Sequence, residues 1–247
     1  MSEFLTISIP TRNRATYLAD LLVSIANQWK EEYKDVIKIQ VLNNRSEDKT
    51  DEIVNAGCYP FDIYYMIQPN KLDGDESIAS AYNNSFGEYT WVCGDDELLP
   101  ENSLSVTLEL LYKYKPALLL PKDLNYVGTV KLDEYYPNYK EFAKYCYKTD
   151  KSILVAHSLI SGNIVKTELF DTKIAEEKRK TNYGHFYGII NGVGNSDLPL
   201  ICPQVPTLTV RLQRAFPVDG LWSEDLEQKQ KQYLEWVCEK FNLKGEN

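Results

Sequence analysis

The chain alternates short runs of apolar residues with longer amphipathic segments. Five apolar runs lie between polar loops and predict buried strands, at residues 4–9, 36–42, 63–67, 89–93 and 117–120. The segments between them predict helices: Leu18, Leu21, Leu22 and Ile25 recur at helical spacing, and further helices are expected at 50–56, 77–86 and 101–114. Strands that alternate with helices predict an α/β fold, a mostly parallel sheet covered on both faces, with ligands over the loops that follow the strands.

The pattern loosens after residue 121. We expect a strand or hairpin arm at 124–132, a helix within 135–147 and a second strand at 158–165. A charged mobile segment or short helix is expected at 168–180, a helix at 186–193 and a last strand at 208–212. A final amphipathic helix is predicted over 223–241, with Ser223 as its N-cap and its apolar side packed on the domain. Without repeats or a clear linker, one domain over 1–247 is expected, divided into a first half, 1–121, and a specialised second half, 122–247.

Three consecutive carboxylates follow the fourth predicted strand, in the turn Gly94-Asp95-Asp96-Glu97. Carboxylates at one strand end repel one another, and a hard divalent cation among them would relieve that repulsion. The alternative is a solvated acidic turn that only closes the strand.

Composition narrows the functional classes. The 247 residues carry a net charge of -9 and are 43% apolar, which favours a real core and argues against a nucleic-acid groove. We see no run long enough to cross a bilayer and no secretion signal, so a cytoplasmic protein is expected. Five scattered cysteines without a CxxC pair favour reduced thiols over disulfides or zinc. The 18 tyrosines suit a sugar-binding cleft, or reflect compositional drift.

Three motifs resemble family 2 glycosyltransferases with the GT-A fold. They are ISIPTRNR at 7–14, VLNNRSEDKT at 41–50 and GEYTWVCGDD at 87–96. In that family the first strand ends in Pro-Thr-x-Asn, the second leads into an acidic turn, and the third stretch leads into the DxD metal motif. Here the motif resembles a Gly-Asp-Asp-Asp variant of bacterial surface-polysaccharide transferases. The second half resembles the family chiefly at residues 160–165, the strand of the acceptor half.

The resemblance implies a mostly parallel GT-A sheet flanked by helices, an acceptor-binding second half and a C-terminal helix. It implies an inverting enzyme that moves a sugar from a nucleotide sugar, a UDP-sugar in the first instance, to a glycan or lipid-linked acceptor in capsule, lipopolysaccharide or other surface-polysaccharide synthesis. Such an enzyme would be cytoplasmic, with peripheral attachment to the inner face of the membrane as an option.

The resemblance also places the nucleotide over three loops. The implied contacts are Pro10, Thr11, Arg12, Asn13, Asn43, Asn44, Lys71, Asp75 and Asp95. Asn43 stands where the family usually has an Asp, and its amide offers both a donor and an acceptor to a base. For the two asparagines ordinary turn chemistry is the alternative. Arg12 and Arg14 could contact phosphate or cap the surface, and Lys71 and Asp75 could belong to a solvated loop.

A divalent metal, Mn²⁺ or Mg²⁺, is expected to neutralise the leaving diphosphate. Asp95 is the expected ligand, because its sequence spacing from Pro100 matches that of the second Asp of the family's DxD motif. In this register Cys93 takes the position of the first Asp. Alternatively Asp95 and Glu97 form the pair, with Asp96 turned to the ribose or the acceptor. The sequence leaves both registers open.

The catalytic base is the least defined part. Family members use an Asp in a Glu-Asp pair that opens a helix, and no such pair follows the acceptor strand here. His185 stands near that position, and a helix start lowers the pKa of a histidine, which favours the neutral base. A buried structural histidine is the alternative, and the competing bases are Asp96, Asp171, Glu177 and Asp197. Arg211 and Arg214 could bind phosphate, although ordinary strand positions are favoured for them.

Two other functions compete with sugar transfer. A nucleotidyltransferase would share the fold and the metal, but it usually carries a glycine-rich basic loop after the first strand, and residues 10–14 contain no glycine. A degenerate GT-A domain that binds a glycan or a partner without catalysis fits the missing Glu-Asp pair and Cys93.

Overall fold

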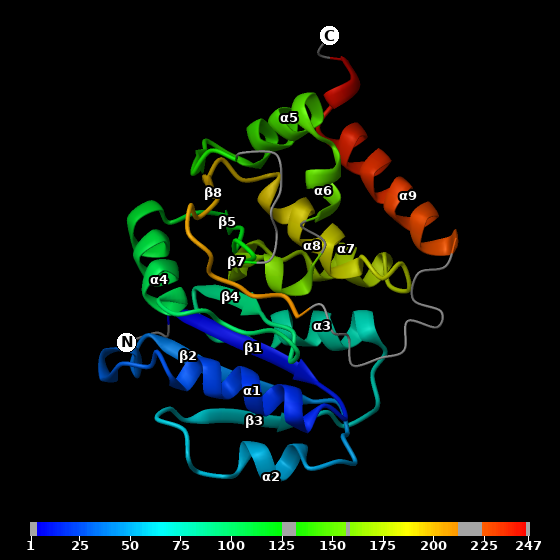
Figure 1. Ribbon diagram of the computed structural model, residues 1–247. Coiled ribbons are helices and arrows are strands. Elements are labelled where there is room, and N and C mark those ends of the chain that lie inside the picture. Colours follow the sequence, from blue (N-terminus) through cyan, green and yellow to red (C-terminus); the bar gives the residue numbers. More distant parts are fainter. Residues whose placement is uncertain (1–3, 125–131, 157–158, 212–223, 246–247) are drawn as a thin grey trace.

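The computed structural model describes residues 4–124, 132–156, 159–211 and 224–245. An eight-stranded sheet runs through the molecule in the order β3-β2-β1-β4-β7-β5-β8-β6 (Figure 1). Its strands are β1 (Leu5–Thr11), β2 (Ile37–Asn43), β3 (Ile63–Ile67), β4 (Tyr89–Val92), β5 (Leu118–Leu119), β6 (Tyr135–Tyr136), β7 (Ile164–Lys166) and β8 (Leu200–Ile201). Each of the five strands predicted in the first half is present, within two residues of its expected ends.

The strand pairing differs between the two parts of the sheet. β1 pairs in parallel with β2 and β4, and β2 pairs in parallel with β3. β7, by contrast, lies antiparallel between β4 and β5, and β6 lies antiparallel to β8. Residues from the two halves of the chain therefore contribute to the same mostly parallel sheet, as the sequence predicts for its first half.

Helices cover both faces of the sheet. The α-helices are α1 (Ala15–Ala26), α2 (Thr50–Val54), α3 (Gly74–Asn83), α4 (Ser103–Tyr114), α5 (Tyr139–Thr149), α6 (Ser152–Ala156), α7 (Thr172–Glu177), α8 (Gly184–Val193) and α9 (Glu224–Lys240), with short 3-10 turns at Glu31–Tyr33, Ile160–Gly162, Thr167–Leu169 and Leu243–Gly245.

Alternating strand residues divide the core into two clusters, because successive side chains point to opposite faces. Trp91 and Cys93 pack with α1 and α4 on one face, whereas Val92 packs with α3, α5, α8 and α9 on the other. The predicted apolar side of the last helix is buried in the second cluster through Tyr233, Val237 and Phe241.

Helix α3 begins earlier than predicted, at Gly74 instead of residue 77. Asp73 accepts a hydrogen bond from the backbone of Glu76 at 2.8 Å, and the Glu76 carboxylate accepts from the backbone of Asp73 at 2.9 Å. This reciprocal capping box satisfies two otherwise unpaired N–H groups and starts the helix three residues sooner.

The second half differs more from its pattern. The strand expected at 158–165 is a 3-10 turn followed by β7, and the charged segment 168–180 contains α7. A two-residue strand, β6, precedes the helix expected within 135–147. Most of the arm expected at 124–132, the N-cap Ser223 and Arg214 lie outside the described residues.

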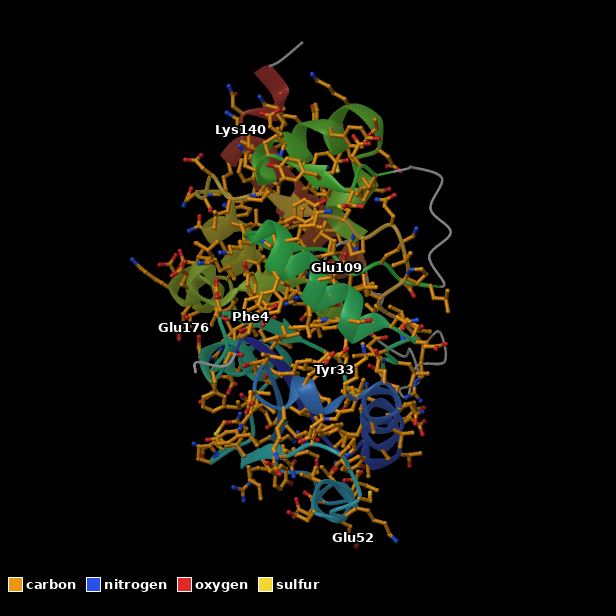
Figure 2. All side chains as sticks on the ribbon, turned by 90° about the vertical axis from the view of Figure 1, so that its left-hand side faces the viewer. Phe4, Tyr33, Glu52, Glu109, Lys140 and Glu176 are labelled. Carbon is orange, nitrogen blue, oxygen red and sulfur yellow. The ribbon has the colours of Figure 1, made fainter. Side chains whose placement is uncertain are left out.

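Figure 2 looks at the amino-terminal edge of the sheet: Phe4, just before β1, and Tyr33, just before β2, face the viewer. The loops that follow β1, β2 and β4 therefore lie on the far side of this view. Those loops carry most of the predicted site residues. Within the described residues, no helix combines the length and apolar character that a membrane crossing requires.

Candidate functional site

The acidic turn follows β4 directly. The Glu97 backbone N–H donates to the Gly94 carbonyl at 3.2 Å, and Leu98 then pairs with Thr209 through two backbone hydrogen bonds of 3.0 and 2.8 Å. The turn is therefore fixed at both ends, by a buried strand and by a segment more than a hundred residues later. Cys93, just before it, is fully buried in the core, and burial together with the carboxylate of Glu97 raises the pKa of its thiol well above the usual value.

Asp95 is held by the last residue of β1 and by the loop that follows it. The Thr11 hydroxyl donates to Asp95 Oδ2 at 2.6 Å, and Arg14 Nη1 donates to Oδ1 at 2.9 Å. Only 3% of Asp95 is exposed. Burial raises the pKa of Asp95, and the Arg14 charge and the Thr11 hydrogen bond oppose that rise. The structure thus brings together two residues that the sequence predicted at separate strand ends.

Arg14 bridges two of the three carboxylates. Its Nη1 atom lies 3.0 Å from Asp96 Oδ2 as well as 2.9 Å from Asp95 Oδ1. Burial alone would lower the pKa of Arg14, but the two carboxylates outweigh it and raise that pKa. A guanidinium inside the chain therefore neutralises part of the acidic turn, a role that the sequence did not indicate for Arg14.

Glu97 has a different environment from its neighbours. It is 8% exposed, its Oε1 lies 3.5 Å from the Ser161 hydroxyl, and its Oε2 is buried without a hydrogen-bond partner in the described part of the chain. Burial and the nearby Asp96 raise the pKa of Glu97 to about 8. A buried carboxyl with an unused oxygen is a group that a cation could ionise and bind.

Ser161 supports the turn from the second half of the chain. Its hydroxyl accepts the Gly94 backbone N–H at 2.9 Å, and its carbonyl accepts the Trp91 indole N–H at 2.9 Å. A Cβ at position 94 would lie 3.4 Å from the Ser161 hydroxyl and 3.1 Å from Asp96 Oδ1, so glycine permits this close approach. The sequence marked 160–165 only as an acceptor strand and gave no signal for this contact.

The loops after β1 and β2 are hydrogen-bonded to each other. The Asn13 side chain accepts the Glu47 backbone N–H at 2.7 Å, and the Asn13 N–H donates to the Ser46 hydroxyl at 2.9 Å. Asp48 accepts the first N–H of α1, from Ala15, at 2.9 Å. Beside this pair of loops, half-buried Arg12 makes no hydrogen bond or ion pair with the described residues.

The two asparagines at the end of β2, Asn43 in the strand and Asn44 just after it, are hydrogen-bonded within the chain. Asn43 is 1% exposed; its amide donates to the Tyr65 hydroxyl at 2.6 Å, and its oxygen accepts the Ser46 N–H at 2.7 Å. Asn44 exchanges two hydrogen bonds with the backbone of Leu72, at 2.9 and 2.8 Å. Both side chains thereby fix the conformation of the loops after β2 and β3, and their contact with a nucleotide remains a prediction.

The remaining predicted residues are Pro10 in β1, Lys71 in the loop before α3, and Asp75 in α3. Pro10 is half-buried at the end of β1, and Lys71 is exposed in the loop before α3. Asp75 is buried in the first turn of α3, where it accepts the backbone N–H of Asn182 at 3.1 Å. Asp75 therefore faces the loop that leads into α8.

His185 is the second residue of α8, so the helix opens near it as predicted, and the side chain is 2% exposed. Of the competing bases, Asp171 caps α7 and accepts from Asn191 at 2.6 Å, whereas Glu177 and Asp197 are exposed. Arg211 contacts α1, donating to Asp20 at 2.8 Å.

The metal prediction can be tested against the donor atoms present. Within the described ranges, no three His, Cys, Asp or Glu side chains are grouped to hold an ion. Mg²⁺-type ions need fewer, since one or two carboxylates, water and substrate phosphates complete their coordination. The unused Glu97 oxygen and the partly exposed Asp96 fit such a site, whereas Asp95 could join it only after Arg14 left its Oδ1 atom.

Comparison with known proteins places this geometry in a family. Residues 6–163 match glycosyl transferase family 2. Over 104 residues the chain is 34% identical to abequosyltransferase RfbV of Salmonella typhimurium; the match covers 41% of this chain and 31% of that protein. The chain thus corresponds to about a third of this relative.

Solved structures share the fold at low identity. Staphylococcus aureus TarS 1–349 with UDP-GlcNAc has a TM-score of 0.68 at 15% identity, over 96% of this chain and 66% of that chain. The Pyrobaculum calidifontis mannosyltransferase PcManGT with GDP-Man and Mn²⁺ has a TM-score of 0.60 at 14% identity, over 98% and 74%. Glucosyl-3-phosphoglycerate synthase of Mycobacterium tuberculosis with Mn²⁺, UDP and glucosyl-3-phosphoglycerate has a TM-score of 0.57 at 14% identity, over 97% of this chain and 80% of that chain.

These structures are GT-A glycosyltransferases, and the mixed, mostly parallel sheet flanked by helices is the GT-A fold. The family match spans more than half of the sequence and includes the loops after β1 and β2, the acidic turn and Ser161. The chain belongs to glycosyl transferase family 2.

Proposed function

We propose that the chain is a metal-dependent, inverting glycosyltransferase that moves a sugar from a nucleotide diphosphate sugar, a UDP-sugar, to a glycan or lipid-linked acceptor of a bacterial surface polysaccharide. The observation that carries the proposal is the acidic turn after β4, which is hydrogen-bonded to Thr11 at the end of β1 and to Arg14 in the loop that follows. Ligands of open α/β sheets bind at this edge. The matched abequosyltransferase supports the polysaccharide role.

The nucleotide would lie over the paired loops after β1 and β2. Arg12, half-buried and without a partner in the described chain, and exposed Lys71 supply cationic groups for the diphosphate. Asn13, Asn43 and Asn44 fix the loop shape, so base recognition would use loop backbone as well as any amide group left exposed.

Asp95, Asp96 and Glu97 would hold the divalent ion, and Mn²⁺ is favoured because two structures of the same fold carry it. When bound, the ion supplies positive charge that stabilises the departing diphosphate. Arg14 would then move from Asp95 to the diphosphate, so the same guanidinium neutralises the turn before donor binding and the leaving group afterwards.

His185 would act as the base. The acceptor hydroxyl gives its proton to the imidazole while its oxygen attacks the anomeric carbon, and the bond from that carbon to the diphosphate oxygen breaks with its electron pair. One displacement inverts the anomeric centre. An acceptor carried on a lipid would be met at the inner face of the membrane.

The test is a binding and hydrolysis screen. Purified protein is heated with UDP-, GDP-, CDP- and dTDP-sugars, each with Mn²⁺ and with chelator, because a ligand that binds the folded state raises the melting temperature. We expect one nucleotide class to stabilise only with Mn²⁺, and slow hydrolysis of its sugar to follow. Asp95→Asn should abolish both effects, and the exposed Asp62→Asn variant is the matched control. Absence of stabilisation by every nucleotide sugar would refute the proposal.

A binding domain without catalysis is the second candidate. It is favoured by the Arg14 bridge, which neutralises Asp95 and Asp96 without any ion. Saturable binding of a nucleotide sugar with no transfer and no hydrolysis, unchanged by Mn²⁺, would support this candidate over the first.

A further inference from the structure

Asp75 lies where the loop after β3 meets the helix that carries His185. The residue belongs to the first turn of α3, and 8% of it is exposed. Its Oδ2 accepts the Asn182 backbone N–H at 3.1 Å, and the backbone N–H groups of Lys180 and Gly184 also donate to it. Lys180 and Asn182 belong to the short loop between α7 and α8, and Gly184 is the first residue of α8.

The backbone of that loop is bent around the carboxylate. Lys180 and Asn182 have φ angles of 71° and 64°. These values lie in the left-handed region, which is unfavourable for residues other than glycine. Alternating conformations of this kind turn several N–H groups toward one point, which makes a concavity for an anion. The anion here is supplied by the chain itself, and it offsets the strain of two unfavourable residues.

Two further contacts join the same segments. Arg179 lies 2.5 Å from Glu76 and 3.6 Å from Asp73, both at the start of α3. A Cβ at Gly184 would lie 2.9 Å from the Ala175 carbonyl and 3.5 Å from the Asp75 carboxyl carbon, so only glycine fits at the first residue of α8. The exposed Arg179 pairs contribute little stability alone, which leaves the buried Asp75 as the main polar contact between the start of α3 and the loop before α8.

We propose that Asp75 is a positioning residue that fixes the start of α8, and with it His185, against the loops on the nucleotide side. The link is continuous: Asn44 holds Leu72, the capping box starts α3 two residues later, and Asp75 then holds Gly184 next to His185. The proposal rests on the proposed function for the role of His185. It also departs from the sequence prediction that Asp75 contacts the nucleotide, since three N–H groups already occupy this buried carboxylate.

The experiment compares Asp75→Ala and Asp75→Asn with the exposed control Asp62→Asn. Three quantities are measured on the full chain: amide hydrogen exchange of residues 180–188, affinity for UDP with Mn²⁺, and the rate of nucleotide-sugar hydrolysis. For Asp75→Ala we expect exchange at 180–184 to rise about tenfold or more as local opening becomes easier. Hydrolysis should fall about 100-fold, since a displacement near 1 Å can cost that much, while UDP affinity stays within about threefold of wild type.

Asp75→Asn should be intermediate, because the amide oxygen still accepts N–H bonds while the negative charge is lost. If Asp75→Ala does not fold, the same measurements are made on Asp75→Asn and on the double variant Asp75→Ala with Asn182→Gly. The glycine removes one of the two strained residues. Unchanged exchange at 180–184 would overturn the proposal, as would loss of UDP affinity in parallel with hydrolysis, which would indicate nucleotide contact.

A rise in exchange with unchanged hydrolysis would also overturn it. Should the wild-type chain bind no nucleotide sugar, the proposed function would fail, while the exchange data would still decide whether Asp75 holds α8.

Discussion

Replacing Glu97 by glutamine should make the protein's stability less dependent on pH. Glu97 is buried beside Asp96, and its pKa is raised from 4.5 to about 8. Between these two values the folded protein keeps a proton that the unfolded chain releases. The contribution of this proton to the free energy of unfolding of the wild type is therefore fully present below pH 4.5, and it is lost as the pH rises through about 8.

The size of the effect follows from the shift. The full difference of 3.5 pKa units, at about 1.4 kcal/mol for each, corresponds to roughly 5 kcal/mol. At pH 7 the free energy of unfolding of the wild type should be about 3 kcal/mol lower than its value below pH 4.5 through this group alone. Glutamine has nearly the same shape and no charge to bury, so the Glu97→Gln variant should gain stability relative to wild type over this range.

The assay is urea unfolding at half-unit steps from pH 5 to pH 8.5 with a chelator present. The free energy of unfolding is compared among wild type, Glu97→Gln and Glu101→Gln, an exposed glutamate nearby that serves as the matched control. A second series with Mn²⁺ should show a smaller pH dependence of the wild type, because a bound cation favours the ionised carboxylate. If the difference between Glu97→Gln and wild type stays constant within about 0.5 kcal/mol across the range, Glu97 is not protonated in the folded protein.

Three other substitutions test the site and the fold. Arg14→Gln should lower the free energy of unfolding by about 3 kcal/mol at pH 7, because it leaves buried Asp95 without its counter-ion, and by less at pH 5, where that carboxyl can take a proton; an equal loss at both pH values in urea titrations would contradict this. His185→Gln should slow nucleotide-sugar hydrolysis about 100-fold without weakening UDP binding by calorimetry, and hydrolysis within a few-fold of wild type would exclude it as the base. Asp73→Ala should cost about 1 kcal/mol through loss of the capping box, and an unchanged denaturation midpoint would show that α3 does not need it.

The first half of the fold was predictable because most of its strands, β1, β2 and β4 among them, are almost entirely buried, while the edge strand β3 still forms a short apolar run. Such strands are nearly continuous apolar runs, and they stand out from amphipathic helices such as α1. The start of α3 was missed because the capping signal, Asp73 with Glu76, precedes the helical pattern. In the second half, β6 and β8 are two residues long, too short to produce a period.

The site was predictable only where it lies in local motifs. Thr11 and the acidic turn were identified, and the fold joins them. The contacts of Arg14 with Asp95 and of Ser161 with Gly94 span 81 and 67 residues of sequence. Neither is encoded in any spacing, because tertiary structure alone brings those positions together. For the same reason the burial of Asn43 could not be predicted from its place at the end of β2.

The placement of β7 has a consequence for how the protein is synthesised. β7 is the strand that joins β4 to β5 in the sheet, and it comes from residues 164–166. A nascent chain that has emerged only as far as β5 therefore exposes unpaired edges on both β4 and β5, which are templates for aggregation. Closure of the sheet has to wait until residues 164–166 have left the ribosome.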